Sequence, residues 1–213
     1  MKKIKPFLLS VVLTLFVAGC DNSLERASNT IGLMQDQVTK IVNELYEVQN
    51  LENTLQSDFE EDLANANDNL EYFNQDEILV MQNISQRKTH LNNMNDAMKE
   101  LNSLVPELES TKKNQNLPAG DFDKLATMIT NLQTDLTTYT DNYLPNLDLE
   151  AQTFQSIGNP NVDYNSFFKV FDNINTLSQD NLYYLDAVLK HFEPLNGLLV
   201  DTKVKIVTLQ EAK

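Results

Sequence analysis

Apolar residues recur along this chain at alternating spacings of three and four, which places them on one face of an α-helix. The first such run comprises Ile31, Met34, Val38, Ile41, Leu45 and Val48. It predicts a helix that begins near Asn22 or Ser23, because either side chain can cap the first turn. No comparably long alternation of apolar and polar residues competes with it, so the pattern favours helices over strands.

The second helix is expected to follow a break near Ser57, since Ser57 and Glu60 have the spacing of a capping box. Its apolar stripe extends from Asp58 to Val105. Pro106 is expected to end or bend it, because proline removes a backbone donor and clashes with the preceding turn. The segment Lys112–Asp121 is rich in Asn, Pro and Gly and is predicted to be a loop.

A third helix is predicted from about Leu125 to Ile157, with a kink at Pro145, before the strong stop at Gly158–Pro160. A fourth helix is predicted to begin near Asp163 and to bend at Pro194. The apolar pattern then continues to the end of the chain. With the third and fourth helices, the whole of the chain after residue 22 is predicted to be helical apart from its loops.

Each predicted helix has a narrow apolar stripe, and a neighbouring helix must therefore cover it. In the fourth helix, Ser178 and Asn181 are polar residues within that stripe. We expect an all-α fold, an elongated antiparallel bundle of three or four long, coiled-coil-like helices. The bundle is expected to form a single helical extracytoplasmic domain over residues 20–213.

The first 20 residues have the layout of a bacterial export signal. Three lysines among the first five residues precede the apolar stretch Phe7–Val17, which is too short for the roughly 20 residues of a membrane-spanning helix. The small residues Ala18 and Gly19 before Cys20 predict a lipoprotein signal peptide over residues 1–19. Cys20 would then carry a diacylglyceryl group, and its amino group can carry an N-acyl chain. The alternative is an ordinary signal peptide cut elsewhere, which leaves the only cysteine as a free thiol.

The chain is strongly acidic, with a net charge of 16 − 31 = −15. Removal of the three signal-peptide lysines leaves 13 − 31 = −18 for residues 20–213. Nucleic acid is therefore not expected as a partner, because binding to phosphates depends mainly on lysine and arginine. Electrostatic attachment to anionic headgroups or wall polymers is disfavoured for the same reason.

No arrangement of residues in the sequence indicates catalysis. His90 and His191 fall in separate predicted helices, and the single cysteine is assigned to the lipid, so no nucleophile and base are paired. The glycines are isolated and form no phosphate-binding loop. We expect no enzymatic activity, and no cofactor apart from the covalent lipid on Cys20.

Two acidic or amide-rich segments were considered as cation sites. Asn65, Asn67 and Asn69 match the odd positions of a calcium loop, but the required glycine and final glutamate are missing. The run Glu60–Asp62 is expected to be a solvated helix face. The sequence therefore predicts no metal site.

Aromatic residues become frequent toward the C-terminus, and an exposed aromatic face can stack on sugar rings. The spacing of Tyr164, Phe167 and Phe171 on one helix face predicts that most of these rings belong to the core. Three others remain as a candidate ligand platform. They are Phe168, Tyr183 and Tyr184.

The chain resembles a known family in several features. They are the lipobox Val17–Cys20, the segments Ile41–Tyr46 and Leu51–Leu55, and an acidic body whose last third is rich in aromatic residues. The chain is similar to the YkyA-type cell-wall binding lipoproteins of Gram-positive bacteria over nearly its whole mature length. The resemblance implies an all-helical extracytoplasmic lipoprotein that associates with the wall and has no known catalytic residues. This sequence is richer in Asn, Gln and Thr than that family, which argues against a charge-based wall contact.

The leading hypothesis is a non-enzymatic binding or scaffold protein, held by lipid at the outer face of the cytoplasmic membrane. Its expected partner is a cell-wall polymer or an envelope protein. One alternative is an enzyme that acts on wall polymers through an unrecognised carboxylate pair. Another is a helical membrane-active protein of the pore-forming kind, which would need a long uncharged apolar segment in the mature chain.

Overall fold

The structure, a computed structural model, describes residues 22–159, 161 and 164–212, and the side chains of 164–167 are not among those described. Every regular element within these residues is helical, which confirms the all-α prediction. The predicted signal peptide and the lipid site at Cys20 lie outside the described residues.

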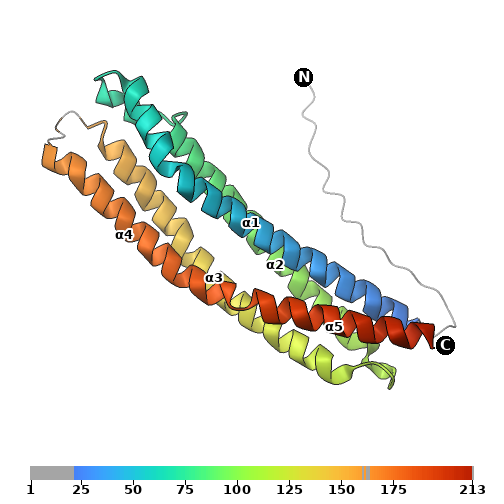
Figure 1. Cartoon of the computed structure of the whole chain (residues 1–213). Helices are drawn as coiled ribbons and strands as arrows, with labels where there is room; N and C mark the ends of the chain where they lie inside the picture. Colours follow the sequence, from blue (N-terminus) through green and yellow to red (C-terminus); the bar gives the residue numbers. More distant parts are fainter. Residues whose placement is uncertain (1–21, 160, 162–163, 213) are drawn as a thin grey trace, which may run out of the picture.

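Long helices joined by short turns form an elongated antiparallel bundle (Figure 1). The α-helices are α1 (Ser23–Ala66), α2 (Leu79–Ser110), α3 (Ala119–Ser156), α4 (Tyr164–Leu189) and α5 (Phe192–Glu211). Two short 3-10 helices, η1 (Leu70–Asn74) and η2 (Thr111–Lys113), lie in the turns. The start of α1 and the end of α5 lie at the same end of the molecule (Figure 1).

The fourth position in the bundle is shared by two shorter helices. Helix α4 packs mainly against α3, whereas α5 packs against α1 and α3. In Figure 1, α5 covers α1 at the end of the bundle where α1 begins and α5 ends, while α4 lies beside α3 in the other half. In that other half, α1 lacks the close packing against the fourth position that it has with α5.

The predicted helix break near Ser57 is wrong, because α1 continues for 44 residues to Ala66. The Ser57 hydroxyl donates to the Thr54 carbonyl at 2.7 Å within the helix, so it does not cap a new one. Phe59 and Ala66 are buried and extend the apolar stripe past the expected break. The second long helix therefore begins at Leu79 rather than at Asp58.

The chain turns instead after Ala66. Asn67 and Asp68 have φ values of 46° and 67°, in the left-handed region that Asn and Asp tolerate better than most residues. Asn69 then caps η1, with its side-chain oxygen accepting from the Glu71 amide at 3.2 Å. Two of the asparagines considered as calcium ligands thus act in the corner between α1 and η1.

Neither internal proline ends its helix. Pro106 was expected to end or to bend its helix, and since it lies inside α2, which continues to Ser110, it does not end it. Pro145 lies inside α3, between the buried Tyr143 and Leu147, and packing on both sides holds the helix together there. The break in the fourth position falls before Phe192, ahead of Pro194, which occupies the first turn of α5, where proline is tolerated.

A continuous apolar core runs along the bundle, and its buried residues extend in sequence from Leu24 to Ile206. Residues 21–213 therefore contain all of this core. Among the described helices, none has a stretch that is both apolar enough and long enough to cross a membrane.

Candidate functional site

Three of the long helices carry a charged residue in the middle of an apolar stripe. Glu52 of α1, Arg87 of α2 and Glu150 of α3 each stand three or four residues from apolar neighbours on both sides. Because each stripe faces the bundle axis, the three side chains meet inside the molecule. They form a polar layer within the mainly apolar core.

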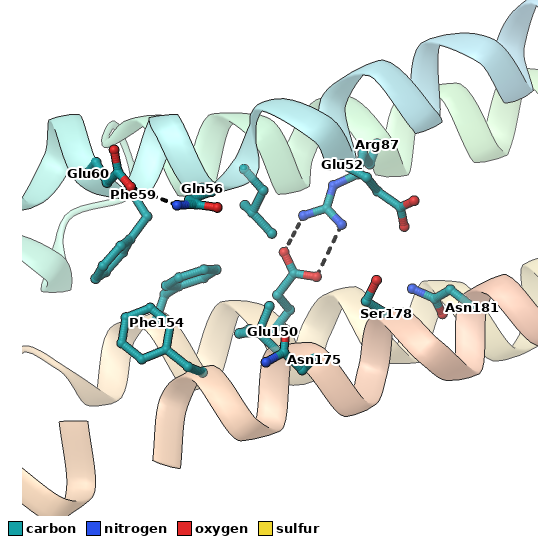
Figure 2. Close-up of a pocket in the computed structure, with 13 residues that line it drawn as sticks. Glu52, Gln56, Phe59, Glu60, Arg87, Glu150, Phe154, Asn175, Ser178 and Asn181 are labelled. Atoms are coloured by element: carbon teal, nitrogen blue, oxygen red, sulfur yellow. Dashed lines mark hydrogen bonds and ion pairs between the residues drawn. The ribbon is translucent and has the colours of Figure 1, made fainter. Parts of the chain in front are cut away.

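Arg87 and Glu150 form a buried ion pair between α2 and α3. Their side chains are 1% and 4% exposed, and the guanidinium donates to both carboxylate oxygens (Figure 2). Such a paired geometry is the strongest that arginine makes with a carboxylate. Burial opposes the charge of Arg87, but the attraction of Glu150 and Tyr143 outweighs it and holds the pKa of Arg87 above its ordinary value.

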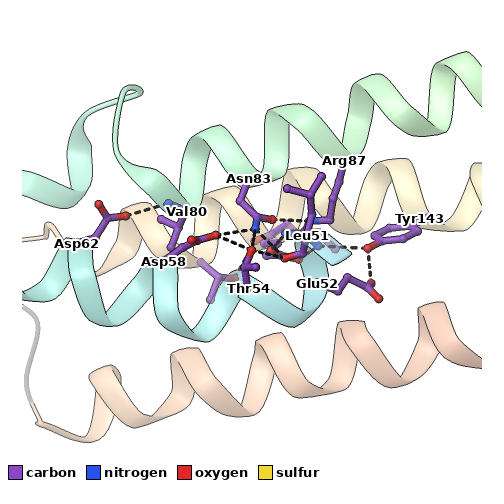
Figure 3. A network of polar contacts seen from close by, with 12 residues as sticks. Leu51, Glu52, Thr54, Asp58, Asp62, Val80, Asn83, Arg87 and Tyr143 are labelled. Carbon is purple, nitrogen blue, oxygen red and sulfur yellow. Dashed lines mark hydrogen bonds and ion pairs between the residues drawn. The ribbon is translucent and has the colours of Figure 1, made fainter. Parts of the chain in front are cut away.

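The remaining donors of Arg87 extend the network to all three helices (Figure 3). Its Nε donates to Asn83 Oδ1 at 2.8 Å, and Nη1 donates to the Tyr143 hydroxyl at 3.2 Å. That hydroxyl in turn donates to Glu52 on α1. Arg87 therefore fixes the relative positions of the three helices at this level.

Asn83 extends the network further toward α1. Its side-chain nitrogen donates to the Leu51 carbonyl and to Asp58 Oδ2, both at 2.7 Å, and lies 3.2 Å from Thr54 Oγ1. The orientation of Asn83 is thus determined, because its oxygen accepts from Arg87 while its nitrogen donates to α1.

Glu52, like Asp58, is a carboxylate of the network that forms no direct ion pair with a described cation. Its two oxygens accept from the Tyr143 hydroxyl and from Gln49 Nε2, the latter at 2.7 Å. Burial raises the pKa of Glu52, and the hydrogen bond from Tyr143 and the charge of Arg87 only partly offset this. The nearby Tyr139 hydroxyl is buried and has no hydrogen-bond partner among the described residues.

The polar layer forms the floor of a groove of about 500 Å³ between α1 and α4. Glu52, Arg87 and Glu150 line it from the first three helices. Figure 2 shows Ser178 and Asn181 of α4 pointing toward them from the opposite wall. These are the two residues that interrupt the apolar stripe of the fourth predicted helix, and in the structure they face the polar layer.

The other end of the groove is aromatic. The Phe59 ring lies 5.8 Å from Phe154 and 5.3 Å from Phe171, in an edge-on arrangement with the latter. Such edge-on contacts are favourable for aromatic pairs. Phe171 was expected in the core, but it remains 36% exposed at the rim, so that expectation is wrong. The side chains of Tyr164 and Phe167 are not described.

The candidate ligand platform lies on α4, apart from the groove lining. Phe168 and Tyr183 are 48% and 75% exposed. Tyr184 is half-buried against the core, and its ring centroid lies 5.3 Å from that of Tyr183. None of the three lines the groove between α1 and α4.

The two histidines lie apart, each bound to an acidic residue of another element. His90 Nδ1 lies 2.7 Å from Glu44, and His191 Nε2 lies 2.7 Å from Asp135. The hydrogen bond from His191 lowers the pKa of Asp135. The first contact links α2 to α1 and the second links the turn before α5 to α3, and neither histidine lines the groove.

The interpretation of Glu60–Asp62 as a solvated face is wrong for Asp62. Asp62 is fully buried, and its two oxygens accept from the backbone amides of Leu79 and Val80 at 3.0 and 2.8 Å. These amides begin α2, which has no cap from its own N-cap side chain. Asp62 thus caps α2 from α1, across the turn.

Glu52, Arg87 and Glu150 were not predicted as site residues, although the sequence marks them. Each takes a position at which the spacing of three and four calls for an apolar residue. A charged residue at such a position, repeated on three helices, predicts a buried polar layer. What the spacing does not give is the alignment of the helices, which brings these positions to one level.

Comparison with known proteins gives one match. No curated protein and no solved structure matches the chain. The family model YkyA, with the description "Putative cell-wall binding lipoprotein", matches residues 22–197. That description names a binding protein and no enzymatic activity. Because the match includes the polar layer, both walls of the groove and most of the chain, this protein belongs to the YkyA family of putative cell-wall binding lipoproteins.

Proposed function

We propose that this protein is a lipid-anchored, non-enzymatic binding or scaffold protein that contacts cell-wall material outside the cytoplasmic membrane. Membership of a lipoprotein family supports a membrane-anchored, extracytoplasmic location. The lipobox assigns the anchor to Cys20, and the acidic helical body supports a role outside the membrane.

The observation that carries the proposal is the groove between α1 and α4. Its volume of about 500 Å³ lies within the roughly 300 to 1,000 Å³ of small-ligand sites. Hydrogen-bonding groups gather at one end and aromatic rings at the other, which suits a ligand with both polar and apolar parts. The buried network beneath holds the floor rigid, so a ligand meets a site that is already formed.

The groove also lies far from the proposed anchor. About 33 helical residues separate Ser23 from Gln56 on the groove wall, which corresponds to roughly 50 Å along α1. With Cys20 in the membrane, α1 would hold the groove at about this height when the bundle stands upright. A site in that position can reach wall material that is not in contact with the membrane.

A second surface could bind the same material. Phe168, Tyr183 and Tyr184 remain proposed as a ligand platform, supported by the exposure of the first two rings. Flat aromatic rings could stack on sugars without the enclosure that the groove provides.

Cosedimentation of residues 21–213 with purified wall tests binding and separates the two surfaces. We expect Phe171→Ala with Asn175→Ala in the groove to reduce retention. The triple alanine variant at Phe168, Tyr183 and Tyr184 measures how much the platform contributes to retention. Tyr46→Ala is the control, because Tyr46 is an exposed aromatic residue of α1 outside the groove lining.

Added salt should leave retention unchanged or slightly improved. A body of this negative charge is repelled by an anionic wall, and salt screens that repulsion more than a contact inside a groove. Retention that collapses with modest salt would contradict the proposed short-range contact. An absence of binding at every salt concentration would instead favour an envelope protein as partner.

The anchor has its own test in the full-length chain. Cys20→Ala should abolish incorporation of a palmitate analogue and leave the protein unprocessed or released, because a single acidic body adds no membrane affinity of its own. Continued incorporation in the variant would rule out Cys20 as the lipid site.

An enzyme acting on wall polymers is the second candidate, favoured by one observation. Glu52, whose pKa burial raises, lines the same groove as Glu150. Glycosidases use two carboxyl groups on either side of the bond they cleave. Here Arg87 binds both oxygens of Glu150, which favours binding without cleavage. Release of reducing sugars from purified wall, lost in Glu52→Gln, would reverse this preference.

A further inference from the structure

We propose that the groove between α1 and α4 binds a peptide bearing a primary ammonium group. The ammonium would lie beside Glu52, and an apolar side chain would lie against Phe59 and Phe171. This inference rests on the proposed binding function of the groove and specifies the chemistry of its ligand.

Charge is the first argument. The described residues that line the groove include three carboxylates, Glu52, Glu60 and Glu150, and one cation, Arg87. Arg87 and Glu150 neutralise each other in their ion pair. The carboxyl groups of Glu52 and Glu60 remain without a described cation, in a body whose net charge is already strongly negative. The groove therefore attracts a cationic group and repels phosphate or carboxylate ligands.

Glu52 can accept the ammonium. A carboxylate offers about four acceptor positions, and the contacts from Tyr143 and Gln49 use two of them. Burial raises the pKa of Glu52, so its charged form is disfavoured in the empty groove. A bound cation would stabilise that charged form. Such partly buried, charge-assisted hydrogen bonds are among the stronger polar contacts in proteins.

The rest of the groove suits a peptide. The wall that α4 contributes carries Asn175 and Ser178 between the aromatic and the acidic ends. These side chains can donate to a peptide carbonyl and accept from a peptide amide. The rings of Phe59, Phe154 and Phe171 give an apolar side chain a place to bind. A lysine-type amine next to an apolar residue combines all three features.

Two tripeptides provide a direct test by calorimetry on residues 21–213. The first is acetyl-Ala-Phe-Lys-amide with a free side-chain amine, and the second is the same peptide with the amine acetylated. We expect saturable binding of the first and at least tenfold weaker binding of the second, in line with the loss of a charge-assisted hydrogen bond.

Variants assign the contact to the groove. Glu52→Gln keeps the size of the side chain and the acceptor for Tyr143, and should weaken binding of the free amine about tenfold while leaving the acetylated peptide unaffected. Glu47→Gln is the matched control, because it removes the same charge from an exposed position on α1 outside the groove lining. Circular dichroism checks that both variants remain folded.

Equal binding of the two peptides, or binding of neither, would overturn the inference. Wall retention measured in parallel distinguishes failure of this peptide inference from failure of the proposed wall-binding function. Retention that depends on Phe171 without peptide binding would leave the groove as a wall-binding site for another ligand. Competition by soluble sugar oligomers would identify that ligand as a glycan. Loss of both peptide binding and wall retention would refute both proposals.

Discussion

At the scale of single residues, we expect the largest loss of stability when one partner of the ion pair between Arg87 and Glu150 is removed. Both side chains are almost fully buried, so each depends on the other for its electrostatic compensation. A buried pair of this kind need not be more stable than an apolar replacement, but removal of one partner leaves the other uncompensated. The contribution of the pair to stability is therefore measured by comparing the free energies of unfolding of the single and double variants.

Arg87→Met should lower the free energy of unfolding by about 3 to 5 kcal/mol, because Glu150 is then left as an unpaired buried charge. The double variant Arg87→Met with Glu150→Leu should recover most of that loss. Urea-induced unfolding followed by circular dichroism measures both. If the double variant were as unstable as the single one, the hydrogen bonds of Arg87 to Asn83 and Tyr143 would be the more important contribution.

Glu52 should make stability depend on pH in the opposite sense to an ordinary salt-bridged acid. Its pKa is higher in the folded protein than the ordinary value of 4.5, so the folded state holds the proton more tightly than the unfolded state. The resulting stabilisation is complete below about pH 4.5 and is lost as the pH rises through the folded-state pKa. The groups facing Glu52 are Arg87, Glu150 and the tyrosine hydroxyls.

Glu52→Gln removes this dependence. Relative to the unaltered protein, the variant should become more stable as the pH rises from about 4.5 toward neutrality, and thermal unfolding across that range measures the difference. Glu47→Gln again serves as the control, since its side chain is exposed. A difference between variant and parent that did not grow with pH would show that Glu52 is not held in a raised-pKa environment.

At the scale of elements, α1 and α2 are joined by more than their apolar stripes. Asp62 belongs to α1 but accepts hydrogen bonds from the first amides of α2. The N-terminal amides of a helix need such acceptors, and a negative charge there also interacts favourably with the helix dipole. The start of α2 is therefore defined by a residue of the preceding helix.

Asp62→Ala should lower the free energy of unfolding by about 1 to 3 kcal/mol and increase hydrogen exchange at Leu79 and Val80. Glu61→Ala, one residue away on the exposed side of α1, should change stability by less than about 0.5 kcal/mol. Equal effects from the two substitutions would contradict the capping role.

The periodicity of the sequence predicts which elements form better than where they end. Apolar spacing predicted the helical class, because burial of a stripe depends on residues close together in sequence. The start of α1 came from the cap candidates Asn22 and Ser23, although Asn22 makes no side-chain capping hydrogen bond, and the stop after α3 came from Gly158–Pro160. The prediction failed at Ser57, where a local capping signal was weaker than the packing of Phe59 and Ala66. It also failed at Asp62, whose partners lie in the next helix and give no local signal.

The candidate site was less predictable for a related reason. A groove exists only where two helices are placed side by side without closing, and that placement depends on the whole bundle. Ser178 and Asn181 were visible as polar interruptions of a stripe, but the residues that line the opposite wall of the groove could not be predicted from them. The lipid site at Cys20 rests on a short contiguous motif and could be proposed from sequence alone.

At the scale of the whole molecule, the bundle is distinguished from a compact protein by its length. The 44 residues of α1 span about 66 Å. A rod of that length and of bundle width has a radius of gyration of about 21 Å, against roughly 16 Å for a compact protein of about 190 residues. Small-angle scattering of residues 21–213 should give the larger value. A result near the compact value would contradict the elongated arrangement.

The uninterrupted course of α1 has a mechanical consequence. Glu52 and Gln56 on the groove wall belong to the same helix that leads down toward Cys20. If a wall ligand is held in the groove and the lipid is held in the membrane, tension between the two runs lengthwise through α1. Because both points of attachment belong to one helix, this load acts on the backbone hydrogen bonds of α1, which lie along the helix axis, and does not pull α1 away from its neighbours. The bundle would then withstand this load, and the ligand would dissociate or the lipid would leave the membrane before the helices separate.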